Sequence, residues 1–437
     1  MGSLFSALTT AVAGLGAQSS AIGNISDNLS NAQTTGYKAV STDFQELVNA
    51  SNASVNNPGG VKATPAYQND VQGSITSADT ATYMAISGQG YFAVESASTD
   101  ATGATIFNST INYTRQGDFT LNKDGYLVNG SGYYLMGYNV SSGIANTAST
   151  TPIQISSLLN DPVPTANISY VANLPSNAAT TYTSSSSTVQ IYDSLGNTHD
   201  VNYVWNKTAT NTWDLNITIP DAAYTQTVAF TFNDGTGSAA AGTLKSIASY
   251  SGTASTAPYT VPSGTADIDL TADFTGLGAG KQNLVLNFGA LNGSTGVTQF
   301  SDTNGTASVT NFSQDGLPKG SFSSLAISKA GLVSINYSNG TNLTIAQIPI
   351  VQFYAQDQLQ RVSGGAYAST IDSGTPRYST AGLNGAGTIS SNSLEQSNVD
   401  IASEFTQLIQ AQQVYSANAK VVTTDNTLLQ TTINMVQ

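Results

Sequence analysis

The sequence has no cysteine and few charged residues, which make up 9% of the chain. Without cysteine there is no disulfide, no thiolate metal ligand and no cysteine nucleophile. The 12 Lys and Arg residues are outnumbered by 26 Asp and Glu residues, and the net charge of −14 argues against the basic surface that binds nucleic acid. No run of 18 consecutive apolar residues occurs, so the sequence predicts no membrane insertion.

Residues for enzyme chemistry are equally scarce. The only histidine, His199, stands beside a turn in YDSLGNTHD, where we expect it on the surface rather than as a ligand or base. Asp193, Asn197 and Asp200 flank it, but their spacing misses the calcium-loop pattern, so an ordinary turn rich in Asp and Asn is expected. The GLGAGK stretch at 276–281 lacks the first Gly and the final Ser or Thr of a phosphate loop. We therefore predict no catalytic, cofactor-binding or metal-binding residue, no cofactor and no enzyme activity.

The first residues lack the positive charge that opens a secretory signal. MGSLFSALTTAVAGLGA is largely apolar, but the first basic residue is Lys38, so a cleaved signal is not predicted. The MGSLFS start also fits a myristoylation pattern at Gly2 and Ser6, a short motif that we attribute to chance. If the chain leaves the cell, we expect a route without signal cleavage.

What the sequence does contain is an apolar repeat at each end. Apolar residues recur at alternating steps of four and three, the spacing of a coiled-coil seam. The N-terminal seam comprises Leu4, Leu8, Leu15, Ile22, Ile25 and Leu29. The C-terminal seam comprises Ile401, Phe405, Leu408, Tyr415, Val422, Leu429, Ile433 and Val436. Both seams are predicted to lie on helices and to carry contacts between subunits.

The N-terminal helix is intrinsically weak, because Gly14, Gly16 and Gly23 each cost about 1 kcal/mol relative to alanine. Burying its seam against one partner hardly offsets the entropy of ordering the segment. We therefore expect the ends to be mobile in the free chain and to become ordered among helices of many neighbouring chains. The alternative is an ordinary hairpin of the two ends within one chain.

The run NAQTTGYK marks the end of the N-terminal helix. Asn31 and the TTG run at 34–36 are turn and cap residues, and the glycine is free to adopt positive φ. Extended structure begins after this turn, and Tyr37, Val40 and Phe44 are its expected anchors.

Between the ends, from about Ser74, the pattern changes to short strands and glycine-containing turns. The Asn-Lys-Asp-Gly sequence at 122–125 predicts a hairpin turn. Residues 236–265 are rich in Gly, Ser, Ala and Thr and are expected to include a long loop. The predicted fold class is multidomain, with a terminal α-helical coiled-coil pair and inserted all-β domains of sandwich or barrel type.

Several segments resemble one known family. NISDNLSNAQTTGYKAVSTDFQEL resembles the N-terminal signature shared by bacterial flagellar rod and hook proteins, although DNLSNAQ stands where Asn-Asn-Leu-Ala-Asn runs are usual. The segment LEQSNVDIASEFTQLIQAQQVYSANAKVV resembles their C-terminal counterpart, and ISGQGYFAV resembles part of their proximal β-domain. The signature residues are Asn28, Leu29, Asn31, Thr35, Gly36, Tyr37, Ser397, Asn398, Val399, Asp400, Asn418 and Ala419.

Within this family the chain resembles the hook proteins in its length and in the segments VQIYDSLGNTHDVNYVW and GLVSINYSNGTNLTIAQIPIVQFYA. The resemblance implies four parts. They are a helical inner-tube domain of residues 1–30 and 395–437, a connecting region of 31–73 and 368–394, a proximal β-domain of 74–150 and 311–367, and an outer β-domain of 151–310.

The resemblance also implies a role and partners. The role is that of a homopolymer forming the curved, flexible, extracellular tube of the flagellar hook, a universal joint that transmits torque from motor and rod to filament. The implied partners are rod proteins below, hook–filament junction proteins above, and the hook cap and flagellar export apparatus during assembly, with export through a type III channel. Two alternatives are a distal rod protein, disfavoured by the insert at 151–310, and a secreted β-rich adhesin, which has no use for paired terminal seams.

Overall fold

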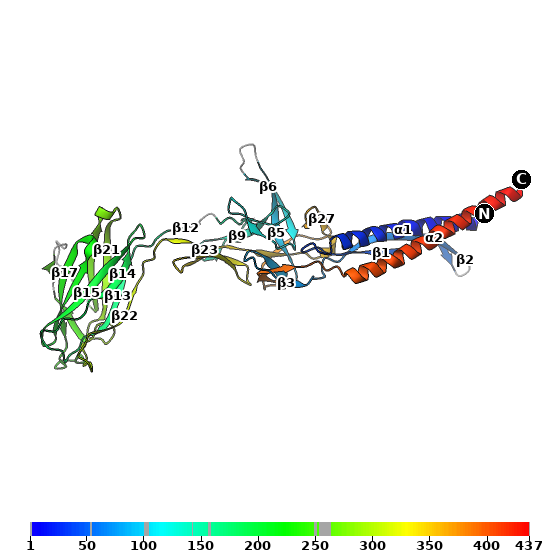
Figure 1. Ribbon diagram of the computed structural model, residues 1–437. Helices are drawn as coiled ribbons and strands as arrows, with labels where there is room; N and C mark the ends of the chain where they lie inside the picture. Colours follow the sequence, from blue (N-terminus) through cyan, green and yellow to red (C-terminus); the bar gives the residue numbers. More distant parts are fainter. Residues whose placement is uncertain are drawn as a thin grey trace. The chain divides into compact units, whose positions relative to one another are not determined.

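The computed structural model describes residues 2–52, 55–99, 105–141, 143–155, 159–248, 251–252 and 264–436. These residues form many β-strands with one long α-helix at each end (Figure 1). This confirms the predicted β-rich chain with terminal helices. By its internal contacts the chain divides into two compact units. Unit 1 comprises Met1–Ser156, Ser324–Asn336 and Asn342–Gln437, and unit 2 comprises Ser157–Ser323 and Tyr337–Thr341.

In unit 1 the two terminal helices, α1 (Gly2–Ser30) and α2 (Ile401–Val436), lie side by side, blue and red in Figure 1. They are antiparallel, because Asn28 near the end of α1 bonds to Glu404 near the start of α2, while Gly14 lies against Asn418. These two contacts are 14 residues apart on both helices, which is two heptads. The two ends therefore pair within one chain, the arrangement that the sequence left as the alternative.

A long antiparallel hairpin packs along α1. Its strands are β1 (Val40–Asn52) and β2 (Val55–Tyr67), and α1 contacts both of them. A Cβ placed on Gly60 would lie 2.9 Å from the Cβ of Ala13, so the β2 backbone approaches the helix closely. Val40 is buried as expected. Phe44 is not, because it lines an open groove of about 260 Å³ between α1, β1 and α2, so its predicted role as an anchor is wrong.

Two strand pairs of unit 1 join the segment that follows the β1–β2 hairpin to the segment that precedes α2. Strand β3 (Ile75–Ser77) pairs with β31 (Ser393–Glu395), and β4 (Met84–Ser87) pairs with β30 (Thr388–Ser391). The turn predicted at 122–125 is confirmed between β7 (Thr120–Leu121) and β8 (Leu127–Val128). The other elements are β5 (Tyr91–Thr99), β6 (Thr105–Thr114), β9 (Tyr133–Ser141), β10 (Ile144–Ala145), β11 (Thr151–Pro152), β24 (Leu332–Tyr337), β25 (Asn342–Gln347), β26 (Pro349–Gln352), η3 (Gln356–Gln358), β27 (Gln360–Val362), β28 (Ala366–Ala368) and β29 (Arg377–Thr380).

Unit 2 contains two sheets that share one hydrophobic core. Buried and exposed residues alternate along most of its strands, as expected for sheets with one covered face. Trp205, Trp213 and Phe288 are among the core residues contributed by both sheets. One sheet has the order β14 (Ser187–Tyr192), β15 (Thr198–Ala209), β16 (Thr212–Ile219), β17 (Tyr224–Phe232), β18 (Leu244–Ile247), with β19 (Ser251–Gly252) also on β17. The other has the order β20 (Thr265–Phe274), β21 (Gly280–Ala290), β13 (Asn167–Asn173), β22 (Ser308–Gln314).

The unit also contains η1 (Pro220–Ala222), η2 (Thr275–Leu277) and the pair β12 (Leu159–Asn160) with β23 (Gly320–Ile327), whose last residues belong to unit 1. The loop predicted within 236–265 falls partly on residues 249–250 and 253–263, which lie outside the described residues.

His199 is buried in unit 2, so its predicted surface position is wrong. Its Nδ1 lies 2.8 Å from Asp221 Oδ2, its Nε2 lies 3.1 Å from Asp193 Oδ2, and its ring stacks on Phe274 at 4.0 Å. These partners compensate the burial of a polar ring. The predicted Asx-rich turn is confirmed, since Asp193 Oδ1 accepts hydrogen bonds from the backbone N–H groups of residues 195 and 197.

Candidate functional site

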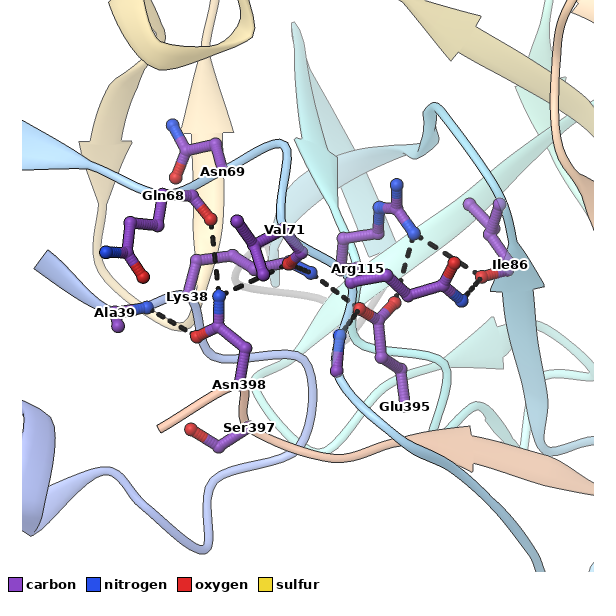
Figure 2. Close-up of polar contacts among 12 residues, drawn as sticks. Lys38, Ala39, Gln68, Asn69, Val71, Ile86, Arg115, Glu395, Ser397 and Asn398 are labelled. Atoms are coloured by element: carbon purple, nitrogen blue, oxygen red, sulfur yellow. Dashed lines mark hydrogen bonds and ion pairs between the residues drawn. The ribbon is translucent and has the colours of Figure 1, made fainter. Parts of the chain in front are cut away.

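The candidate site is a buried polar junction in unit 1, where the terminal helices meet the β-strands. Figure 2 shows residues from several distant parts of the sequence lying close to one another there. The chain leaves α1 through residues 36–40, passes the junction again at 68–73, and returns to α2 through 395–398. The junction therefore ties both chain ends to the β-rich part of the unit.

Glu395, at the end of β31, is the centre of this junction. Its Oε1 lies 2.5 Å from Lys38 Nζ, and its Oε2 lies 3.1 Å from Arg115 Nη1 (Figure 2). The backbone N–H of Gly73 also donates to Oε1, at 2.9 Å. All three charged side chains are buried. One carboxylate thus joins segments that lie 357 and 280 residues away in the sequence.

Each of the two cations also donates to a backbone carbonyl, although the buried Nε of Arg115 has no hydrogen-bond partner. Lys38 Nζ donates to the carbonyl of Val71 at 2.7 Å, and Arg115 Nη2 donates to the carbonyl of Gly88 at 2.8 Å. Burial lowers the pKa of Lys38, and the Glu395 carboxylate acts in the opposite direction. Buried ion pairs are tolerated only when such hydrogen bonds accompany them, and loss of one partner leaves the other charge unpaired.

Two asparagines of the signature connect the helices to the junction. Asn398 accepts from the N–H of Ala39 at 2.7 Å and donates to the carbonyls of Gln68 and Val71 (Figure 2). Asn28 accepts from the N–H of Val40 and donates to its carbonyl, both at 2.9 Å, and also donates to Glu404. An asparagine amide can accept and donate at once. Each side chain therefore satisfies backbone groups of the segment that leaves α1.

Tyr37 and Gly36 shape the turn between α1 and β1. The Arg361 guanidinium lies over the Tyr37 ring at 5.2 Å and donates to the carbonyl of Lys38. Burial raises the pKa of Tyr37 to about 12, although Arg361 opposes this. Gly36 has a φ of +68°, and a Cβ there would lie 2.8 Å from the backbone of Arg115. The predicted positive φ is confirmed, and the close approach to Arg115 adds a second reason for glycine.

The other signature residues surround these. Asp400 caps α2, since its Oδ1 accepts from the N–H groups of Ala402 and Ser403. Asn31 closes the end of α1 through Asp27. Ser397 accepts from the N–H of Val399, Asn418 lies against Gly14 on α1, and Leu29, Thr35 and Ala419 are partly buried.

On α1 the residues that face inward are mostly small. Ile25 is the one predicted seam residue that is fully buried among those described, while Leu8, Leu15, Ile22 and Leu29 are partly buried. The most buried positions also include Ala11, Gly14, Ala17 and Ala21. Small side chains allow the α2 and β2 backbones to approach. The side chain of Leu4 lies outside the described side chains.

On α2 one of the two predicted rows faces α1. Leu408, Val422 and Leu429 are partly buried, and the alternate inward row is formed by Glu404, Ala411, Asn418 and Asp425. Each position of this row lies one residue before a position of the predicted row that contains Phe405. Ile401, Phe405 and Tyr415 are exposed. The side chains of Ile433 and Val436 lie outside the described side chains.

Both helices retain uncovered apolar residues. On α2, Val414, Val421 and Leu428 are exposed at a spacing of seven, and on α1 Phe5 and Val12 are exposed at the same spacing. Apolar residues at this spacing are typical of a seam between helices. The sequence reading missed the row at 414, 421 and 428, although its spacing was visible.

Sequence reasoning also missed the triad of Lys38, Arg115 and Glu395. Each lies inside or beside a family-like segment, in GYKAV, YTRQG and SLEQSN. The available signal was weak, namely charged residues inside family-like segments of a chain with few charges. Within the described residues no group of three or more metal-ligating side chains is assembled, and no helix there is long and apolar enough to cross a bilayer.

Comparison with known proteins identifies the family. Residues 390–435 match the family model described as flagellar basal body rod FlgEFG protein C-terminal, and residues 159–317 match the flagellar basal body protein FlaE D2 domain. The chain is 32% identical over 442 residues to flagellar hook protein FlgE of Rhizobium meliloti (strain 1021), covering 99% of both chains. It is 27% identical to flagellar hook protein FlgE of Salmonella typhimurium, covering 97% of this chain and 98% of the relative. A crystal structure of Helicobacter pylori flagellar hook protein FlgE2 aligns with 74% of this chain and 100% of its own, at 15% identity and a TM-score of 0.47.

The family models and the two hook-protein relatives define a structural protein of the bacterial flagellum rather than an enzyme. Within that class the chain belongs to the flagellar hook protein family, because similarity at 32% identity extends over nearly the whole of both chains. The expectation of a hook subunit is confirmed.

Proposed function

We propose that the subunit polymerises into a curved, flexible helical tube, which acts as a universal joint between rod and filament. The observation that carries this proposal is the uncovered apolar rows on both terminal helices, exemplified by Val414, Val421 and Leu428. Exposed heptad rows on an otherwise paired helix favour contacts with further helices. The chain supplies such helices from its own copies.

The terminal helices then form the inner wall of the tube. Residues 1–30 and 395–437 form this layer as coiled-coil partners, and residues 31–73 and 368–394 connect it to the outer layers. Residues 74–150 and 311–367 form the proximal β-domain, and residues 151–310 form an outer domain with sandwich-like packing. The predicted seam residues of both helices act in assembly between copies.

The buried junction transmits load between these layers. Glu395 binds Lys38, in the segment that leaves α1, and Arg115, directly after β6, and it lies shortly before α2, while Asn28 of α1 binds the backbone of Val40. Torque that reaches the strands therefore passes to both helices through short, buried contacts rather than through a flexible linker. The outer surfaces, with few charges, suit shallow polar contacts that slide as the tube bends.

The proposed partners follow from position in the flagellum. Rod proteins contact the lower end of the tube and hook–filament junction proteins contact its upper end. The hook cap and the flagellar export apparatus act during assembly. Export proceeds without signal cleavage to the extracellular side, and a chain without disulfides suits passage in an unfolded state.

Electron microscopy of cells lacking the gene tests the function, beside wild-type cells labelled with gold-tagged antibody against residues 151–310. The proposal predicts label on a short curved segment at the filament base and no external filament in the mutant. Label confined to a straight shaft would identify a rod protein instead. Label over the cell surface, with filaments intact, would identify an adhesin.

A further inference from the structure

His199 of unit 2 is a titratable side chain that the proposed function does not use. It is the only histidine of the chain, its side chain is 3% exposed, and it lies near the start of β15. Histidine is the residue whose charge ordinarily changes between about pH 5 and 8. A buried histidine with charged neighbours can therefore couple local structure to the acidity of the solution.

Both ring nitrogens of His199 face carboxylates. Nδ1 lies 2.8 Å from Asp221 Oδ2, and Nε2 lies 3.1 Å from Asp193 Oδ2. Ionised carboxylates only accept hydrogen bonds, and a neutral imidazole has one N–H and one lone pair. Only the doubly protonated ring can therefore donate to both carboxylates. A neutral ring turns a lone pair toward one of them.

The two carboxylates differ in their surroundings. The side chain of Asp193 is fully buried, whereas that of Asp221 is 50% exposed. Burial acts to raise the pKa of Asp193, but hydrogen bonds from Asn197, His199 and the backbone of the turn together lower it. Asp193 is therefore ionised at neutral pH and has no access to water. A neutral ring is expected to keep its proton on Nε2, toward Asp193, and to give up Asp221, which water can solvate.

The contact with Asp221 joins η1 to the β14–β15 end of the unit. No side chain caps η1 at Ile219, and η1 ends at Ala223, whose φ of +47° lies in the left-handed region that L side chains rarely adopt. The imidazole ring itself is held by stacking on the buried Phe274, at 4.0 Å. Loss of the Asp221 contact therefore releases η1 rather than the ring.

Other charged groups near His199 in the sequence or the fold point elsewhere. Asp200 follows His199 directly but is exposed, because successive side chains of a strand lie on opposite faces. Asp273 precedes Phe274 and pairs with Lys281 at 3.7 Å. Among the described residues, only the two carboxylates of Asp193 and Asp221 lie within ion-pair distance of the ring.

We propose that His199 is a proton-operated clasp within unit 2. In acid, the doubly protonated ring ties η1 to the turn between β14 and β15. Loss of one proton as the pH rises leaves the ring bound to Asp193 and frees Asp221 together with η1. The clasp acts within one chain and needs no neighbouring copy. It therefore goes beyond the proposed function, and its failure would leave that function untouched.

Nitrogen NMR of the full-length chain, labelled with isotope only in histidine, tests the protonation of the ring, because one histidine gives one pair of ring signals. The proposal predicts two imidazolium signals at about pH 5.5, and the signals of a neutral ring with its proton on Nε2 at about pH 8.5. A neutral ring with its proton on Nδ1 would keep the bond to Asp221 and would overturn the proposal. A ring whose protonation does not change between these pH values would overturn it as well.

Hydrogen exchange of the full-length chain, followed by mass spectrometry of peptides that span η1, tests the release. The N–H of Ala223 donates to the carbonyl of Pro220. After correction for the intrinsic pH dependence of exchange, its protection should fall about tenfold between the same pH values, the effect of one lost hydrogen bond. Asp221→Asn should abolish this fall, and Asp200→Asn, at the exposed neighbouring aspartate, is the matched control that should retain it. Protection that is independent of pH in the wild type, or a fall that persists in Asp221→Asn, would overturn the proposal.

Discussion

At the scale of single residues, Glu395 joins segments that lie 357 and 280 residues away from it in the sequence. Its carboxylate faces Lys38 and Arg115, and none of the three side chains has more than slight exposure. Desolvation makes such charges costly when one partner is missing. The consequence is that the two chain ends and the β-strands share one electrostatic contact.

We predict that Glu395→Ala destabilises the chain by about 3–5 kcal/mol, because two cations remain buried without their carboxylate. Urea unfolding of the purified chain measures this. Glu46→Ala, at an exposed position of β1, is the matched control and should stay within about 0.5 kcal/mol of wild type. Equal losses of unfolding free energy in both variants would show that Glu395 has no special role in stability.

Alkaline titration tests the environment of Tyr37. Its pKa is about 12 in the folded chain against an ordinary value of 10.0, because burial disfavours the phenolate. The folded state therefore holds this proton more tightly, and stability is full below pH 10 and is lost as the pH rises to 12. Tyr37→Phe should lower stability at pH 8, and the difference from wild type should shrink between pH 10 and 12. A constant difference would contradict this assignment.

The residue scale also shows what the sequence could predict. Gly36 and the turn at 122–125 were predictable, because backbone conformation there depends on local residue type. The partners of Glu395 were not, because contacts between residues hundreds of positions apart leave no local pattern. His199 was misplaced for the same reason, since Asp221 and Phe274 come from other elements.

At the scale of elements, α1 and α2 pair through small and polar residues rather than through large apolar ones. Asn28 faces Glu404 and Gly14 faces Asn418, while Phe405 and Val414 remain exposed. The heptad period was predictable from the sequence, but the face that each row would take was not. Apolar periodicity identifies a seam without naming its partner. The role of the seam residues in assembly stays a prediction.

Substitutions at two glycines of α1 distinguish the effect of helix packing from the effect of helix propensity. A Cβ on Gly14 would lie 2.8 Å from Asn418 Nδ2, whereas one on Gly16 would meet nothing within 4 Å. We predict that Gly16→Ala stabilises the free chain by about 1 kcal/mol, as expected for an exposed helix position. Gly14→Leu should destabilise it by about 1–3 kcal/mol through overpacking against α2. Thermal unfolding followed by circular dichroism measures both, and similar shifts would argue against the close helix contact.

The buried carboxyl group of Glu404 makes the stability of the helix pair depend on pH. Burial raises the pKa of Glu404, Asp400 adds to this and Asn28 opposes it, and one carboxylate oxygen has no hydrogen-bond partner. The free-energy cost of burying the Glu404 carboxylate is full above its raised pKa in the folded chain, and it is absent below the ordinary value of 4.5. Glu404→Gln keeps an acceptor for Asn28, so it should stabilise the chain at pH 7 and have little effect at pH 4. Destabilisation at pH 7 would show that the charge is needed there.

At the scale of the whole molecule, a β-rich chain with a helix at each end was predictable from composition, strand periodicity and the terminal repeats. The family was predictable from its signature segments, because these lie at both ends and keep their order. The pairing of the ends within one chain was weighed as the weaker alternative, since the entropy estimate omitted the β1–β2 hairpin that covers α1. This hairpin supplies burial that the helix seam alone does not.

Electron cryomicroscopy of hooks isolated from cells tests the central claim most directly, namely that the terminal helices build the tube. The account predicts helices from many copies around a central channel, with Val414, Val421 and Leu428 against a helix of another copy. Terminal helices that pair only within one chain and lie on the outer surface of the tube would contradict it.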